Sequence, residues 1–219
     1  MIRLVIFDLD GTLVNSLCDL ADSVNYALEK SGYPTHKTDE YRYFVGNGTY
    51  KLCERALPQD MRNADEINRL HKIFEERYNE SYLNKTAPYS GIDELLTALE
   101  EIGVIFAAAS NKTDVFTQRI IDKLFGSKRF CAVFGKSDDR PAKPDPRIVD
   151  EILKGSGVLK SEALMVGDSD VDVLTAKNSG IISVGCLWGF RTYDELVNAG
   201  ADYVINKPCE LLKLIQEGL

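Results

Sequence analysis

The sequence predicts an α/β fold, a doubly wound parallel sheet with a helical insertion after its first strand. Two observations lead to this prediction. Short apolar segments recur along the 219 residues, and segments with apolar residues at helical spacing separate most of them. The short segments are continuously apolar, as in strands that helices cover on both faces. Strands that alternate with helices indicate a parallel sheet.

Six segments have the length and composition of buried strands: residues 4–7, 104–108, 132–134, 163–166, 181–184 and 203–205. Five further segments have the periodicity of helices that cover a sheet: residues 92–101, 113–125, 146–154, 171–178 and 210–215. In the first of these helices, one face carries Ile92, Leu95, Leu96 and Leu99. The alternation of the two sets supports the doubly wound arrangement.

Residues 17–83 interrupt the alternation, because they carry helical patterns and no convincing strand. Apolar residues recur at helical spacing within 17–30, and 63–82 is typical of a long polar helix. We therefore expect residues 16–83 to form a helical domain above the carboxyl end of the first strand. Residues 1–15 and 84–219 would form the α/β core. The alternative is a helical decoration packed on the edge of the sheet.

Composition limits the classes of partner. The formal net charge of −8 argues against a nucleic-acid partner, which would require a basic surface. No apolar stretch approaches the ~18 residues of a membrane span. No signal peptide precedes the first strand, so we expect a cytoplasmic protein without a membrane partner. An acidic protein that binds an anionic substrate needs local positive charge from a metal ion, a lysine or a helix N-terminus.

The five cysteines are odd in number and include no Cys-x-x-Cys pair. Buried, reduced thiols are therefore expected rather than disulfides. The two histidines, His36 and His71, do not have the spacing of metal ligands, which argues against a zinc site.

The segment after the first predicted strand is the most informative. Asp8 and Asp10 follow the strand directly, and Gly11 and Thr12 come next. Residues i and i+2 of a strand point to the same side, so both carboxylates face one site. Ligand sites of α/β folds lie at the carboxyl ends of strands. Such a pair suits a divalent cation, or a nucleophile beside an acid/base, although acids also occur at ordinary turns.

Three further motifs follow in order. Ser110-Asn111 ends an apolar segment, Lys143 stands in Ala-Lys-Pro-Asp-Pro, and Asp168 follows a later strand and a glycine. Together with Asp8-Leu-Asp10-Gly-Thr-Leu, this set resembles the haloacid dehalogenase (HAD)-like hydrolase superfamily over nearly the whole chain. The resemblance implies a Rossmann-like core, a small helical cap domain over the site, and a Mg²⁺-dependent phosphatase.

The resemblance also implies roles for the motif residues. Asp8 is the nucleophile that forms an aspartyl-phosphate, and Asp10 is the general acid/base. Lys143 directs its charge at the phosphate or at Asp8. Asp8, the backbone carbonyl of Asp10, and Asp168 bind Mg²⁺. Asp172 supports the metal site from nearby, or alternatively caps a helix.

Substrate contacts are expected from two places. Ser110 and Asn111 would bind phosphate, or alternatively form the N-cap of the following helix. Gly46, Asn47 and Gly48 would bring backbone amides to a small acid's carboxylate, or mark a break between two helices. The chain reads Asn15-Ser16 where phosphoglycolate phosphatases usually have Asp-Ser, a departure that affects entry into the cap rather than the site acids.

Within the superfamily, the cap segment Phe44-Val-Gly-Asn-Gly and the later Trp188-Gly-Phe-Arg resemble phosphoglycolate phosphatase and its close relatives. The best single expectation is 2-phosphoglycolate, acted on by a monomer or homodimer. Phosphatases of pyrophosphate, sugar phosphates and nucleotides share these features. A phosphosugar mutase with the same nucleophile and a catalytically silent binding protein are two further hypotheses.

Overall fold

The computed structural model describes residues 1–218 of the chain. Its centre is a six-stranded parallel sheet with the order β5-β4-β1-β6-β7-β8. The strands are β1 (Leu4–Phe7), β4 (Ile105–Thr113), β5 (Ala132–Lys136), β6 (Ala163–Gly167), β7 (Ile182–Cys186) and β8 (Tyr203–Ile205). β1 pairs with β4 on one side and β6 on the other, so the strand order switches direction beside β1. Ligands of open α/β sheets bind at such a point.

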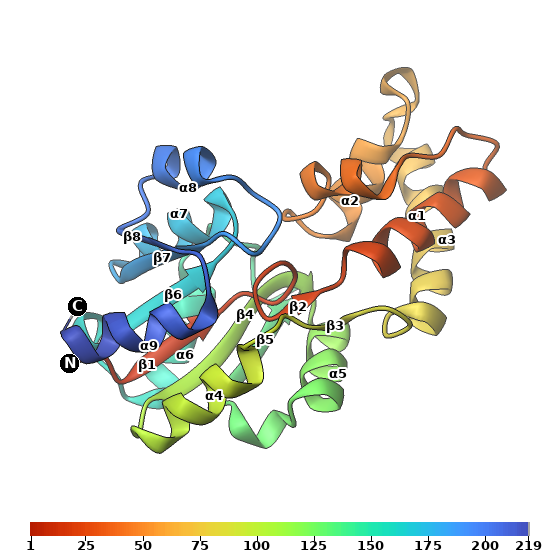
Figure 1. Cartoon of the computed structure of the whole chain (residues 1–219). Coiled ribbons are helices and arrows are strands. Elements are labelled where there is room, and N and C mark those ends of the chain that lie inside the picture. The colour runs from red at the N-terminus through yellow and green to blue at the C-terminus, as the bar shows by residue number, and fades with distance from the viewer. Residues whose placement is uncertain (219) are drawn as a thin grey trace.

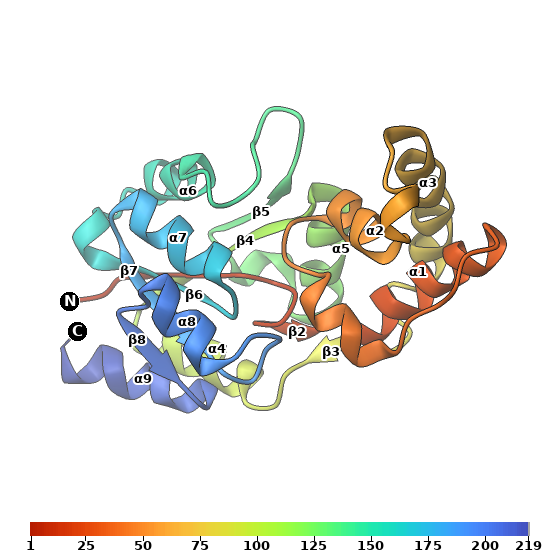
Figure 2. The ribbon, with the colours of Figure 1, turned by 90° about the horizontal axis from the view of Figure 1, so that it is seen from above.

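Helices cover both faces of this sheet, as Figure 2 shows from above. Val5 and Phe7 face a cluster with α4, α5 and α9, whereas Leu4 and Ile6 face a cluster with α6 and α7. The alternation along β1 therefore buries both of its faces. The helices of this core are α4 (Ile92–Glu101), α5 (Asp114–Leu124), α6 (Arg147–Ser156), α7 (Asp170–Ser179), α8 (Tyr193–Ala199) and α9 (Pro208–Glu217).

A helical lobe, residues 17–81, extends from the carboxyl side of β1 (Figure 1). It contains α1 (Leu17–Lys30), α2 (Thr49–Ala56) and α3 (Ala64–Ser81). The chain enters and leaves it through an antiparallel pair, β2 (Val14–Asn15) and β3 (Ala87–Pro88). The lobe has its own apolar cluster, which also takes in Phe116 of α5 and Phe190. These two aromatic side chains pack the lobe against the core.

The predicted fold class is confirmed, and several bounds match the prediction, including those of β1, α1, α4 and β8. Other elements were missed or misplaced. β4 continues to Thr113, beyond its apolar segment, and α2, α8 and the β2–β3 pair were not predicted. β2 and β3 have two residues each, which is too short for any periodicity to appear.

The thiols differ in part from the expectation. Every cysteine is free, but Cys131 and Cys209 are exposed, whereas Cys53 and Cys186 are buried as expected. Among residues 1–218, no helix has the length and apolar character needed to cross a membrane.

Candidate active site

Asp8 stands at the switch point of the sheet. Its backbone N–H donates to Val166 O at 2.9 Å, which extends the β1–β6 pairing by one residue and fixes the start of the side chain. The chain then turns back at Gly11, whose φ is +92°. A Cβ at Gly11 would lie 2.3 Å from Asp168 Oδ2. Glycine is therefore required both by the backbone conformation and by the close approach of Asp168.

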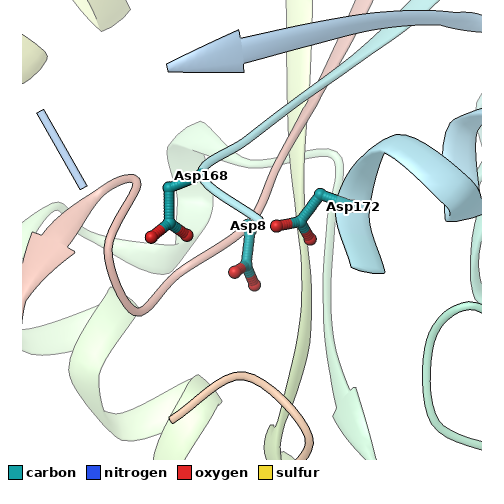
Figure 3. A group of neighbouring side chains, drawn as sticks. All are labelled: Asp8, Asp168 and Asp172. Carbon is teal, nitrogen blue, oxygen red and sulfur yellow. The ribbon is translucent and has the colours of Figure 1, made fainter. Parts of the chain in front are cut away.

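Three carboxylates form an acidic group: Asp8, Asp168 and Asp172. One oxygen from each lies within 4.8 Å of the others. Figure 3 shows that Asp8 follows β1, Asp168 follows β6, and Asp172 lies on the first turn of α7. Asp172 also accepts hydrogen bonds from Ser169 N at 3.1 Å and Ser169 Oγ at 2.6 Å, so it takes part in the N-terminal capping of α7, and its support of a metal site stays a prediction.

Burial and mutual repulsion raise the pKa of two members of the acidic group, Asp8 and Asp168. Burial, followed by the charge of Asp172, raises the pKa of Asp8 from 3.8 to about 7, against the opposing effect of Lys143. Burial, followed by the charges of Asp172 and Asp8, raises the pKa of Asp168 well above its usual range. Mg²⁺ prefers oxygen ligands, and a cation bound here would relieve this repulsion. The donor set therefore fits the expected metal.

Lys143 contacts two members of the acidic group. Its Nζ lies 2.7 Å from Asp8 Oδ1, 2.7 Å from Asp172 Oδ1 and 2.8 Å from Ala109 O, so all three ammonium protons have acceptors. Burial alone would lower the pKa of Lys143, but Asp172 and Asp8 outweigh it and raise the pKa above its usual range. Lys143 therefore remains charged beside the expected nucleophile.

Asn111 connects Lys143, the sheet and the helical lobe. Its Oδ1 accepts from Lys143 N at 2.7 Å, and its Nδ2 donates to Lys143 O at 3.1 Å and to Gly46 O at 3.0 Å. The alternative that Ser110 or Asn111 caps the next helix is wrong, because Thr113 precedes α5. Both residues lie within β4, where its register with β5 shifts between Ala109 and Thr113.

Asp10 does not join the acidic group. Its two carboxylate oxygens lie 2.9 and 2.8 Å from Lys112 Nζ, and Ser16 Oγ donates to Asp10 Oδ1. Asp8 and Asp10 thus line one cavity, as the i, i+2 spacing predicts, but each is paired with its own lysine.

The cavity lies between the sheet and the helical lobe. The core contributes Asp8, Asp10, Ser110, Asn111 and Lys112, and the lobe contributes Leu20, Val45, Gly46, Gly48, Thr49 and Leu52. Most polar side chains therefore come from the core, and the lobe adds apolar side chains and backbone. Two of the predicted loop residues, Gly46 and Gly48, line the cavity. Asn47 instead accepts a hydrogen bond from Arg55 NH2 at 2.6 Å.

Comparison with known proteins places this geometry in a family. The model of the haloacid dehalogenase-like hydrolases matches residues 5–186. The chain belongs to this family. A phosphoglycolate phosphatase of Vibrio parahaemolyticus is 32% identical over 98% of this chain and 96% of its own length. One of Mesorhizobium japonicum is 35% identical over 85% of this chain and 83% of its own length.

Solved structures agree with this assignment. A predicted phosphoglycolate phosphatase from Haemophilus somnus has a TM-score of 0.89 at 29% identity over 98% of both chains. CbbY from Rhodobacter sphaeroides, solved with phosphate, has a TM-score of 0.78 at 22% identity over 96% of both chains, which shows a shared fold. These matches confirm the predicted family, the fold class and the prediction of a phosphatase.

The sequence analysis of this HAD-like hydrolase did not identify Lys112 and Ser16 as partners of Asp10. Lys112 follows the Ser110-Asn111 motif directly, beyond the predicted strand 104–108, and no local pattern distinguished it from an exposed loop lysine. Ser16 was noted only for the Asn15-Ser16 departure. Its contact with Asp10 depends on the turn through Gly11, which brings the start of α1 back beside the site.

Proposed function

We propose that this protein is a Mg²⁺-dependent phosphomonoesterase that acts on a small phosphorylated metabolite through an aspartyl-phosphate at Asp8. The best candidate substrate is 2-phosphoglycolate. The observation that carries the proposal is the position of Asp8. Its carboxylate lies at the switch point of the sheet, opens onto the cavity, contacts Lys143 at 2.7 Å and belongs to the acidic group.

Asp8, Asp168 and the backbone of Asp10 would hold Mg²⁺, with Asp172 beside them. When bound, the ion supplies positive charge that offsets the repulsion between a carboxylate and a phosphate. Lys143 adds a fixed positive charge on the same side. Ser110 and Asn111 would hold the phosphate oxygens, because both line the cavity next to Asp8.

The proposed reaction has two displacements at phosphorus. In the first, an oxygen of Asp8 bonds to phosphorus, the ester P–O bond breaks, and Asp10 gives a proton to the leaving oxygen. In the second, Asp10 takes a proton from water, the water oxygen bonds to phosphorus, and the bond to Asp8 breaks. Inorganic phosphate and the free alcohol are the products, and Asp8 and Asp10 return to their starting states.

We also propose that residues 16–83 act as a cap that closes over this cavity. The β2–β3 pair lies at both crossings between lobe and core, and we place the hinges of this motion at residues 14–16 and 85–89. Closure would exclude water from the site. Hydrogen exchange should slow at these hinges when an unreactive phosphate analogue binds with Mg²⁺, and unchanged exchange would contradict the hinge assignment.

The choice of 2-phosphoglycolate rests on the names of the relatives and on the cavity. The lobe lines the cavity with Gly46 and, at the start of α2, with Gly48 and Thr49, where no side chain caps the backbone N–H groups of the helix. Such amides suit a small carboxylate. A phosphosugar mutase would use the same acids, but it would pass the phosphoryl group from Asp8 to a sugar phosphate instead of water and so form a sugar bisphosphate.

The test is phosphate release from a panel containing 2-phosphoglycolate, sugar phosphates, nucleotides and pyrophosphate, with Mg²⁺ or with chelator. We expect Mg²⁺-dependent release that is highest for 2-phosphoglycolate and that is abolished by Asp8→Asn. Substantial turnover by Asp8→Asn would refute the mechanism. Preference for another compound would refute the named substrate alone, and a bisphosphate product would favour the mutase.

A further inference from the structure

Lys112 is a buried charged residue to which the proposed reaction has so far given no role. It lies on β4, and its side chain is 1% exposed. A buried ammonium group is costly unless opposite charge and hydrogen-bond acceptors surround it. Here both oxygens of Asp10 are within 2.9 Å of Nζ. Burial alone would lower the pKa of Lys112, but Asp10 outweighs it and raises the pKa above its usual range.

The other side of the ammonium group faces the helical lobe. Lys112 Nζ lies 5.0 Å from the ring centroid of Tyr78, a fully buried residue of α3. This distance is within the range of a cation–π interaction. Lys112 therefore lies between Asp10 of the core and Tyr78 of the lobe. Ser16, directly before α1, donates a hydrogen bond to the same carboxylate.

Lys112 and Ser16 together restrict the carboxylate of Asp10 more than either residue would alone. Lys112 reaches both oxygens and Ser16 reaches one of them, which limits rotation of the carboxylate about its side-chain bonds. They also keep the side chain of Asp10 apart from the acidic group, although Asp8 is two residues away. A free carboxylate so close to that group would be drawn to the same cation.

We propose that Lys112 is the positioning residue of Asp10: together with Ser16 it holds this carboxylate where it serves the leaving oxygen. The proposal rests on the proposed function above, since it concerns the same reaction. The competing role for Lys112 is direct binding of the substrate's carboxylate. The structure favours positioning, because Asp10 occupies two of the three ammonium protons and Tyr78 covers a further side.

The experiment compares two phosphate esters in Lys112→Met, which removes the charge and keeps most of the stem. Release of the alkoxide of 2-phosphoglycolate needs a proton, whereas 4-nitrophenyl phosphate releases a stable anion. The ratio kcat/KM reports the steps through release of this first product. Because general acid catalysis contributes roughly 10²–10⁴-fold, we expect about a 100-fold loss with 2-phosphoglycolate and less than about a 5-fold loss with the aryl ester.

Three further variants complete the design. Lys112→Arg keeps the charge and should recover most of the lost activity with 2-phosphoglycolate. Lys123→Met, an exposed lysine of α5, is the matched control and should leave both activities unchanged. Asp10→Asn combined with Lys112→Met should be no slower than Asp10→Asn alone, because residues that act through one group are not additive. This double variant carries neither buried charge, so it tests the coupling even if Lys112→Met unfolds.

Equal losses with both esters, or additive losses in the double variant, would overturn the proposal. A raised KM for 2-phosphoglycolate at unchanged kcat would also overturn it, in favour of direct carboxylate binding. These outcomes leave the proposed function standing, provided that the wild-type protein is active with Mg²⁺ and Asp8→Asn is not. Failure of the wild-type protein to release phosphate from either ester would overturn the proposed function and this inference together.

Discussion

Asp8 should make the metal-free protein less stable as the pH rises. Burial and the charge of Asp172 raise the pKa of Asp8 from 3.8 to about 7 in the folded protein. In the unfolded chain this carboxyl ionises at its ordinary value. Between these two pKa values, the folded protein keeps a proton that the unfolded chain has released. The free energy of unfolding therefore falls as the pH rises through this interval, and becomes constant above it.

The size of the effect follows from the two pKa values of Asp8. A tenfold change in an ionisation constant corresponds to about 1.4 kcal/mol, so a rise in pKa from 3.8 to about 7 corresponds to about 4 kcal/mol. Asp8→Asn lacks the titrating group but keeps an oxygen for Lys143. Relative to the wild-type protein, it should therefore gain up to about 4 kcal/mol of stability between about pH 4 and pH 8 in the presence of chelator.

Urea unfolding of both proteins at several pH values, extrapolated linearly to water, measures this difference. Asp170→Asn is the matched control, because Asp170 is exposed on α7, and its difference from the wild-type protein should be small and independent of pH. Added Mg²⁺ should reduce the advantage of Asp8→Asn at high pH, since the ion binds the ionised form. A wild-type curve that stays parallel to that of Asp8→Asn across the whole pH range would refute the reasoning.

Three further substitutions test other contacts of the site. Lys143→Met should lower the rate of phosphate release at least ~100-fold. Because it breaks a buried ion pair, it should also lower the free energy of unfolding in urea by about 3–5 kcal/mol. Near-wild-type values of both quantities would contradict the role of this lysine. Gly11→Ala should weaken Mg²⁺ binding in calorimetric titration, since its Cβ would lie 2.3 Å from Asp168 Oδ2, and unaltered affinity would show that the turn can adjust. Asn111→Ala removes the hydrogen bond to Gly46 O that joins the core to the lobe, so hydrogen exchange of the β2 and β3 amides should become faster. Unchanged exchange would show that this hydrogen bond does not hold the lobe against the core.

The sequence was sufficient to predict the sheet and to predict that the site lies at the carboxyl ends of its strands. Buried parallel strands are continuously apolar, so β1 and β6 were visible as segments that end in aspartates. The carboxyl ends of neighbouring parallel strands meet at one edge, which brings Asp8 and Asp168 together. These inferences need only local composition and the rules of parallel sheets.

The rest of the site depends on contacts that no local pattern records. The pairing of Lys112 with Asp10 joins residues 102 positions apart, and its burial also requires Tyr78 of the lobe. A lysine after Ser-Asn looks the same in the sequence whether it is exposed or buried. Likewise, Asp172 joins the acidic group from the first turn of α7, where it also accepts hydrogen bonds from Ser169. The sequence left capping and metal support as alternatives; the hydrogen bonds to Ser169 show the capping, and metal support stays a prediction.

The division of the site into two ion pairs has a consequence for its charge. With all four carboxyl groups ionised, Asp8, Asp10, Asp168 and Asp172 would carry four formal negative charges, and Lys112 and Lys143 carry two positive charges. The net charge of −2 that remains would be balanced by one divalent cation. Because Lys112 neutralises Asp10 locally, this excess is concentrated on the acidic group rather than spread along the cavity. A bound Mg²⁺ would bring this fully ionised site to formal neutrality, and a protonated Asp10, as the first displacement requires, would leave it with one positive charge toward an approaching phosphate.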